Sequence, residues 1–246
     1  MSGHSKWSTI THKKAATDKK RGQQFSKLAR AIMVAAKEGG GDPDSNAALA
    51  NAVAKAKSYS LPRENIERAI QKGAGGGEGE NFETVTYEGF GPGGAAFVVE
   101  ALTDNRNRTA ANVRSIFTKA GSALGAPGSV AWKFDRKGVV ILENVADEDE
   151  LLLAAAEAGA DDSEGEDGIF RVTTEPTELS VVRIALEAAG FDVVSAELTL
   201  LPKQLAEIDD EGSRKVLKMV DSLEDDDDVQ EVFFDVEITE AVLAEQ

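Results

Sequence analysis

The sequence contains no cysteine and only two histidines, His4 and His12, both close to its N-terminus. The absence of cysteine excludes disulfides, thiolate zinc sites and cysteine nucleophiles. Because both histidines lie in one short basic segment, histidine-based metal or acid–base chemistry is not expected in a folded core. The sequence also lacks any apolar run close to the roughly 20 residues that span a bilayer, and its beginning lacks the apolar core of a signal peptide. We therefore expect a cytoplasmic protein with no membrane partner.

No nucleophile–base pattern, cofactor fingerprint or metal-ligand set is present in the sequence. We therefore predict that the protein is not an enzyme, has no catalytic residues, and takes no metal, cofactor or small-molecule substrate. The acidic runs "DDSEGED" (161–167) and "DDDD" (225–228) offer carboxylate oxygens but lack the spacing of a calcium-binding loop. Both runs are predicted to be solvated turns.

The segment "GFGPGG" (89–94) matches the G-x-G-x-x-G pattern of dinucleotide sites. That site requires a helix N-terminus after the glycines, so that backbone amides meet the pyrophosphate. Here the glycines are followed by the strand-like run "AAFVVEAL", and Pro92 removes one amide donor. The segment therefore predicts a tight β-hairpin.

Charge is distributed very unevenly along the chain. The formal net charge is −17, yet residues 1–30 carry eight basic side chains and one acid, a net of +7. The following residues carry 19 basic and 43 acidic side chains, a net of −24. Clustered positive charge attracts polyanions, whereas the remainder of the chain repels them. The alternative is an ordinary solvated basic face on an acidic, soluble protein.

The first 22 residues are predicted to form a flexible basic arm, because their few apolar residues make no continuous helical stripe. Lysines alternate there with His and Trp, which suits phosphate contacts combined with stacking on an unpaired base. Trp7 could equally dock on the protein as a hydrophobic anchor. The candidate nucleic-acid contacts of this region are His4, Lys6, Trp7, His12, Lys13, Lys14, Lys19, Lys20, Arg21 and Lys27.

The segment "TDNRNRT" (103–109) lies between a predicted buried strand and a predicted helix. Arg106 and Arg108 would stand beside free helix N-terminal amides, an arrangement that binds anions. The alternative is that the Asn or Thr side chains simply cap the helix. Both interpretations stay open, and the two arginines are added to the candidate contacts.

Three short helices are predicted after the arm, forming a helical domain over residues 23–73. Their apolar residues recur at helical spacing and would face a common core: Phe25, Leu28, Ala29, Ile32 and Ala36; Leu49, Val53 and Ala56; Ile66, Ala69 and Ile70. The Gly-rich run at 73–79 is predicted to be a flexible linker.

The rest of the chain predicts two two-layer α/β domains, which gives an α+β fold class. Residues 137–203 predict a self-contained, ferredoxin-like βαβαβ unit. An earlier strand is predicted at Val130, Trp132 and Phe134, followed by a turn at 135–138. The last strand, at residues 232–236, has no partner in its own neighbourhood, and its backbone groups require one. We therefore expect this third domain to be inserted into the second, which would comprise residues 80–136 and 204–238.

Three blocks of the sequence resemble the signature segments of the YebC/PmpR family: "GHSKWSTITHKKAATDKKRG" (3–22), "LPRENIERAIQKGAG" (61–75) and "YEGFGPGGAAFVVEALTDNRNRT" (87–109). The resemblance covers nearly the whole chain. It implies a three-domain cytoplasmic protein with a helical N-terminal domain, and binding roles for the arm and for "TDNRNRT". Members of the family are commonly described as DNA-binding transcriptional regulators. Relatives, including a mitochondrial translational activator of cytochrome oxidase, are associated with the ribosome and with elongation through proline-rich sequences.

Two functions follow from these observations, both non-enzymatic and both based on nucleic acid as the partner. We expect a ribosome-associated translation factor that binds ribosomal RNA, because a lysine-rich arm on an acidic body suits a crevice walled by phosphates. The alternative is a DNA-binding transcriptional regulator that acts on promoter DNA. The sequence leaves base specificity and oligomeric state open.

Overall fold

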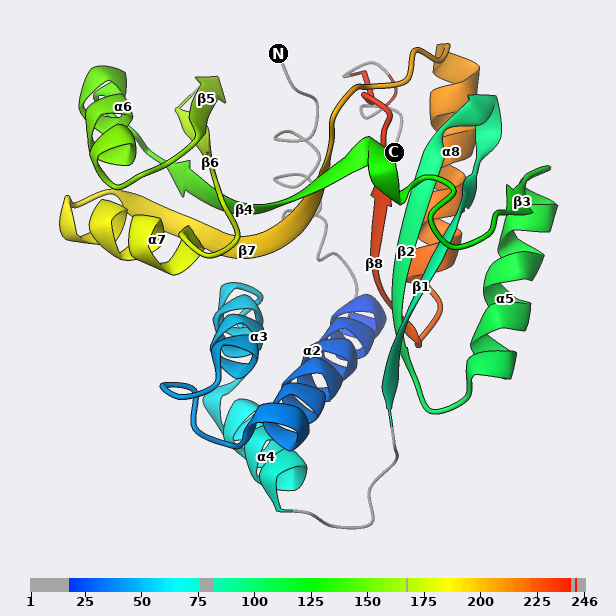
Figure 1. Cartoon of the computed structure of the whole chain (residues 1–246), viewed down its shortest axis with the longest axis horizontal. Coiled ribbons are helices and arrows are strands. Elements are labelled where there is room, and N and C mark those ends of the chain that lie inside the picture. The colour runs from blue at the N-terminus through cyan, green and yellow to red at the C-terminus, as the bar shows by residue number, and fades with distance from the viewer. Residues whose placement is uncertain (1–17, 76–81, 167, 240–241, 243–246) are drawn as a thin grey trace. The chain divides into compact units, whose positions relative to one another are not determined.

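The computed structural model describes residues 18–75, 82–166, 168–239 and 242, which form three helices followed by two four-stranded sheets with helices (Figure 1). Of these residues, one compact unit holds 18–30, 82–135 and 201–242, and a second holds 31–75 and 136–200. None of the helices within the described ranges combines the length and the hydropathy needed to cross a membrane. The predicted linker falls largely on residues 76–81, outside the described residues.

The N-terminal helices are α2 (Asp18–Gly39), α3 (Ala47–Ser58) and α4 (Arg63–Ala74). The sequence predicts an arm up to residue 22, but α2 begins at Asp18. Extending an existing helix by one residue orders only that residue and adds one backbone hydrogen bond. Because α2 is held by side-chain contacts further along the helix, it extends back to Asp18. The apolar positions predicted to face the core are largely buried, with Ile32, Leu49 and Ala56 fully inaccessible.

One asparagine and one glycine shape the helical region within the second compact unit. Asn46 caps α3 by accepting a hydrogen bond from the Leu49 amide at 3.1 Å. Its own amide donates to the carbonyls of Ala35 and Gly40, both at 2.8 Å, which ties the end of α2 to the start of α3. Gly73 lies so close to α2 that a Cβ there would stand 2.2 Å from the Met33 carbonyl oxygen. Only glycine permits this approach of α4 to α2.

The first sheet has the order β3-β1-β2-β8, formed by β1 (Glu83–Phe90), β2 (Ala96–Thr103), β3 (Ala123–Leu124) and β8 (Val229–Phe234). Strands β1 and β2 pair antiparallel from Glu83↔Thr103 to Phe90↔Ala96, and the short 3₁₀ turn η1 (Pro92–Gly94) joins them. "GFGPGG" is therefore a hairpin turn, as predicted, with Gly93 and Gly94 at positive φ. A strand, not a helix, follows these glycines.

The last strand, β8, pairs antiparallel with β2 in a register that includes Phe97↔Phe234 and Val99↔Val232. This pairing places the end of the chain in the first sheet, so the residues between the two parts form an insertion. The predicted α+β class, with the third domain inserted into the second, is confirmed. The exact domain bounds stay a prediction.

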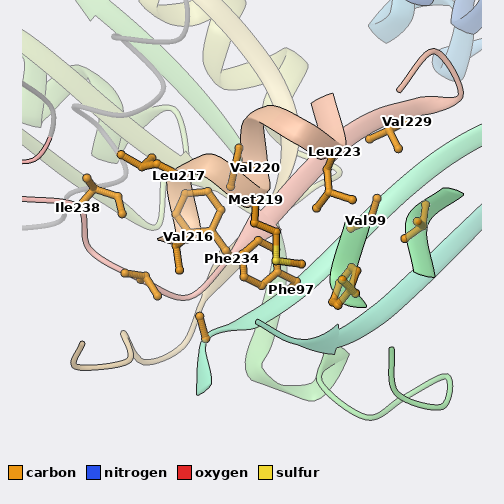
Figure 2. Packing of buried hydrophobic residues seen from close by; sticks show 14 of the residues in the cluster. Phe97, Val99, Val216, Leu217, Met219, Val220, Leu223, Val229, Phe234 and Ile238 are labelled. Atoms are coloured by element: carbon orange, nitrogen blue, oxygen red, sulfur yellow. The ribbon is translucent and has the colours of Figure 1, made fainter. Parts of the chain in front are cut away.

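Helices α5 (Arg106–Lys119) and α8 (Asp210–Glu224) supply the core of this first unit. Figure 2 shows how the apolar face of α8 packs against Phe97, Val99 and Phe234 on the strands. The ring of Phe97 lies edge-on to Phe117 of α5, 6.0 Å between centroids, and is stacked on Phe234 at 5.9 Å. Such aromatic pairs stabilise a core beyond the area that they bury.

The second sheet has the order β5-β6-β4-β7, formed by β4 (Phe134–Glu143), β5 (Asp162–Glu166), β6 (Ile169–Thr174) and β7 (Asp192–Pro202). Helices α6 (Glu148–Glu157) and α7 (Leu179–Ala188) pack on one face of it. Their buried residues, including Leu151, Val182 and Leu186, share a single core cluster with residues of β4 and β6.

Two local predictions in this region are wrong. The stretch around Val130 and Trp132 is not a strand but leads into a 3₁₀ turn, η2 (Ala131–Lys133), because the Glu88 carboxylate accepts the amide protons of Val130 and Ala131. Residues 135–138 are not a turn but belong to β4, where Gly138 pairs with Thr174.

The acidic run 161–167 is also not a solvated turn in its described part. Residues 162–166 form β5, which pairs antiparallel with β6. Arg171 of β6 forms an ion pair with Glu164 of β5, and Gly165 leaves room for the ring of Phe170. Tertiary pairing therefore overrides the low strand propensity of Asp, Glu and Gly in this segment.

Candidate nucleic-acid interface

The predicted contacts of the N-terminal region fall into three groups. Six of them lie outside the described residues: His4, Lys6, Trp7, His12, Lys13 and Lys14. Lys19 and Lys20 belong to the first turn of α2, and the side chain of Arg21, next along the helix, is exposed. Lys27 is buried, at 6% relative exposure.

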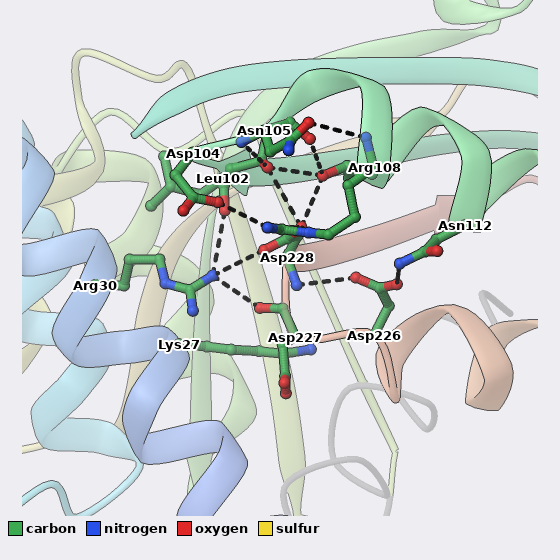
Figure 3. A network of polar contacts seen from close by, with 12 residues as sticks. Lys27, Arg30, Leu102, Asp104, Asn105, Arg108, Asn112, Asp226, Asp227 and Asp228 are labelled. Carbon is green, nitrogen blue, oxygen red and sulfur yellow. Dashed lines mark hydrogen bonds and ion pairs between the residues drawn. The ribbon is translucent and has the colours of Figure 1, made fainter. Parts of the chain in front are cut away.

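One face of α2 explains the burial of Lys27. Gln23, Lys27 and Arg30 follow one another at helical spacing, and within the same compact unit they contact the end of α8 or the loop after it. Figure 3 shows Lys27 and Arg30 beside this loop. The Lys27 ammonium donates to the carbonyl oxygen of Glu224, at 2.6 Å, and Gln23 donates to Asp225 and Asp227. Glu224 is the last residue of α8, and a positive charge at the C-terminal end of a helix complements the helix dipole.

Arg30 extends the same contact. Its guanidinium donates to the Asp227 carbonyl at 3.0 Å and lies 3.3 Å from the Asp228 carboxylate, while it covers the ring of Phe82 at 4.8 Å from the centroid. We call this face, with residues 224–228, the α2–aspartate contact. The described basic side chains of this face are held by the protein's own acidic loop, so Lys27 has no exposed ammonium to offer a phosphate.

Asp228 is the centre of the polar network in Figure 3 and is only 5% exposed. One of its oxygens accepts from Arg108 Nη2 at 2.7 Å, from the Thr109 hydroxyl at 2.7 Å and from the Thr103 hydroxyl at 3.3 Å. The other oxygen faces Arg30. The prediction that residues 225–228 are a solvated turn is wrong for Asp228, whose carboxylate links strand β2 to helices α2 and α5.

The protonation behaviour of the network follows from these contacts. Burial opposes the ionisation of Asp228, but hydrogen bonds from Arg108 and Thr109, with the charges of Arg108 and Arg30, lower its pKa below the ordinary value. The same hydrogen bonds to Asp228 and Asp104 raise the pKa of the Arg108 guanidinium. Burial lowers the pKa of Lys27, against the attraction of Glu224 and the neighbouring aspartates. The carboxylate of Asp228 is therefore held in its charged form.

In "TDNRNRT" the structure shows the capping arrangement. Asn105 is the N-cap of α5, and its side chain accepts from the Arg108 amide at 3.1 Å. The Arg108 side chain bridges Asp104 and Asp228, each at 2.7 Å. Arg106 is 64% exposed and lies 3.5 Å from Glu83. Of the two arginines predicted to bind an anion, Arg106 is the more accessible.

A surface depression of about 470 Å³ opens beside this network. Its charged lining consists of two arginines and five aspartates: Arg30, Arg108, Asp104, Asp225, Asp226, Asp227 and Asp228. A phosphate placed there would meet more negative than positive charge, which disfavours binding. The depression is therefore a poor site for a nucleic-acid backbone, and the basic residues before Gly22 are the better candidates.

Arg30, Thr103, Thr109 and Asp228 form a connected group that was not predicted from the sequence. The spacing of Gln23, Lys27 and Arg30 on one face of α2 was an available signal. The acidic run gave none, because four consecutive aspartates do not reveal which one is buried.

Comparisons with known proteins agree with this organisation. A family model described as the TACO1/YebC protein N-terminal domain matches residues 5–76, and a model of the TACO1/YebC second and third domain matches residues 82–236. A "Probable transcriptional regulatory protein" of Rubrobacter xylanophilus is 53% identical over 247 residues, covering 100% of this chain and 99% of its own. One of Citrifermentans bemidjiense with the same description is 50% identical over 240 residues, covering 98% and 97%.

A solved structure also matches. The crystal structure of a conserved hypothetical protein, Aq1575 from Aquifex aeolicus, has a TM-score of 0.84 and 47% sequence identity, over 94% of this chain and 96% of that one. These matches confirm the family resemblance that the sequence blocks indicated. The relatives are named regulatory proteins, and their names describe no catalytic activity.

Proposed function

The chain belongs to the TACO1/YebC family, and from that premise we propose that it is a non-enzymatic regulator of transcription that binds DNA through its basic N-terminal residues. The observation that supports DNA most directly is the name shared by the relatives, "Probable transcriptional regulatory protein", at 50–53% identity over nearly the full chain. The charge distribution supports the N-terminal region, because residues 1–30 carry a net +7 and the remainder a net −24.

The side chains proposed to contact phosphates are those not engaged by the α2–aspartate contact. Lys27 and Arg30 face residues 224–228, so they stabilise the protein instead of meeting a ligand. Arg21 lies six residues before Lys27 on α2 and is exposed, and it directly follows Lys19 and Lys20 in the sequence. The candidates that carry the affinity are therefore Lys6, Lys13, Lys14, Lys19, Lys20 and Arg21.

The proposal is tested by crosslinking the protein in cells and sequencing the attached nucleic acid. We expect DNA enriched at promoters, and we expect Lys13→Ala with Lys14→Ala to reduce the recovery strongly. The matched control is Lys119→Ala with Lys218→Ala, which removes two exposed charges from α5 and α8. Recovery of ribosomal RNA without promoter DNA would contradict the DNA proposal.

A second candidate function is a translation factor that binds the ribosome, and the acidic body favours it. A body with net charge −24 is repelled by long stretches of nucleic acid, whereas a short basic segment can reach phosphates in a folded RNA site. In that function the tip of the arm, with Lys6 and Trp7, would recognise shape, and the later lysines would supply charge.

The two functions differ in what the arm's tip contributes. A ribosome-directed protein should co-sediment with intact ribosomes in moderate salt, and Lys6→Ala with Trp7→Ala should weaken this more than it weakens binding to random duplex DNA. Equal losses on the two ligands, or tight binding confined to one promoter, would favour the transcriptional function. Sedimentation and fluorescence anisotropy on the same protein batch provide the comparison.

A further inference from the structure

Large apolar side chains are exposed at few places in the described residues, and most of those places lie on α6 and α7. The exposed set consists of Phe90, Trp132, Leu152, Leu153, Val181 and Ile184, of which the last four belong to these two helices. Leu153 is 62% exposed, Ile184 55% and Val181 54%. Single exposed apolar residues are normal, but a concentration on adjoining elements marks an interaction surface.

The two helices place these residues on one surface. Leu151 and Ala155 of α6, with Leu179, Val182 and Leu186 of α7, pack into the same core cluster on one face of the second sheet. The helices also pack against each other. Leu153 and Ile184 each stand two residues after a fully buried one, Leu151 or Val182, which at 100° per residue turns them away from the sheet. The side of the α6–α7 pair that faces away from the sheet therefore carries Leu153 and Ile184, and on α6 the same spacing places Asp149 and Glu157 on that side too.

The segment that contains α6 is strongly acidic in sequence. From Glu143 to Gly168 the sequence has eleven acidic side chains and no basic one. Four of the acids belong to α6 itself: Glu148, Asp149, Glu150 and Glu157. On α7 the one basic side chain, Arg183, is bound by Glu187 of the same helix through contacts of 2.7 and 2.8 Å. On α6 and α7 together, five acids stand against the single base Arg183, and we call these acids the acidic rim: Glu148, Asp149, Glu150, Glu157 and Glu187.

We propose that the outward face of α6 and α7 is a docking surface for a basic amphipathic helix of a partner protein. Apolar residues of that helix at i, i+3, i+4 and i+7 would cover Leu153, Val181 and Ile184, and its lysines or arginines would face the acidic rim. A second copy of this chain would bring two acidic rims together, and nucleic acid would be repelled, so charge complementarity selects a basic protein segment. The surface uses none of the basic N-terminal residues, so one chain would have different residues for a protein partner and for nucleic acid.

The test uses the full chain and a labelled 15-residue helix of leucine and lysine, with leucine on one face. A matched peptide has glutamate at every lysine position. We expect saturable binding of the lysine peptide only, weakened about tenfold or more by Leu153→Ser with Ile184→Ser, because two apolar anchors are lost. Phe90→Ser is the control, since it removes an exposed apolar side chain outside this surface. Nucleic-acid binding should be unchanged in both variants.

Every outcome bears on the proposal. If the lysine peptide binds the double variant and the control equally well, the binding is only attraction by net charge and the proposal is overturned. The absence of saturable binding would overturn the proposal as well. If the native protein self-associates and Leu153→Ser with Ile184→Ser abolishes this, the surface binds a second copy of the chain, and the proposed partner helix is wrong. Thermal unfolding checks that the variants are folded. If the double variant unfolds at a lower temperature than the native protein, Val181→Ser alone should still lower the affinity for the lysine peptide several-fold. In the same setting Glu148→Gln with Glu157→Gln should lower the affinity and its dependence on salt.

Discussion

Asp228 is the centre of the polar network that joins α2, β2 and α5, and its substitution has a definite expected cost. In Asp228→Asn the charge that Arg108 and Arg30 share is lost, and an amide cannot accept the same set of hydrogen bonds. Because both arginines are partly exposed, water replaces some of the loss, and we expect destabilisation of about 1–3 kcal/mol. Urea unfolding measures it. Asp227→Asn, at an exposed position of the same run, should cost much less.

The lowered pKa of Asp228 gives this contribution a pH dependence of known sign. A carboxyl group whose pKa is lower in the folded state stabilises the protein above its unfolded pKa, about 3.9, and this stabilisation is lost as the pH falls through the folded value. The difference in unfolding free energy between the native protein and Asp228→Asn should therefore be constant from pH 7 to about 5 and shrink below pH 4. A difference that grows on acidification would contradict the assignment.

At the scale of one element, α2 carries two side chains with the same sequence prediction and different structural positions. Lys27 donates to the Glu224 carbonyl from a buried position, whereas Arg21 is exposed. Lys27→Ala should lower the unfolding free energy by about 1–3 kcal/mol through the lost hydrogen bond and packing. Arg21→Ala should leave stability nearly unchanged and weaken nucleic-acid binding. Thermal unfolding and anisotropy on both variants check this, and the reverse pattern would place the ligand on the α2–aspartate contact.

The elements also show how far the sequence carries the fold. Periodicity predicts the three N-terminal helices, because the apolar residues that recur at helical spacing, such as Ile32, Leu49 and Ala69, are the ones buried in the structure. The unpaired strand at the end of the chain predicts the insertion, because its backbone requires the partner that β2 supplies. Strand β5 escapes prediction, because Asp, Glu and Gly favour turns and only pairing with β6 makes them a strand.

The candidate site is less predictable than the fold, for a related reason. Composition locates the positive charge, but it cannot tell which basic side chain meets a ligand and which meets an aspartate of the same chain. Lys27 and Arg108 are examples, since their partners lie 197 and 120 residues away. Such pairs depend on tertiary structure, whereas the helix cap at Asn105 depends on four neighbouring residues and was among the alternatives.

At the scale of the whole molecule, the separation of a +7 N-terminal segment from a −24 remainder makes the salt dependence of binding the most direct measure of the proposed interface. If about five phosphates are neutralised, log K should fall with log salt at a slope of roughly −4.5 on duplex DNA and roughly −3.5 on single strands. Lys13→Ala with Lys14→Ala should reduce the magnitude of the slope on duplex DNA by about 1.8, because each lost phosphate contact contributes about 0.9. Lys119→Ala with Lys218→Ala changes the net charge equally but should leave the slope unchanged, since those lysines lie on α5 and α8. Equal changes in the two variants would mean that net charge, and not contact by the N-terminal lysines, controls binding.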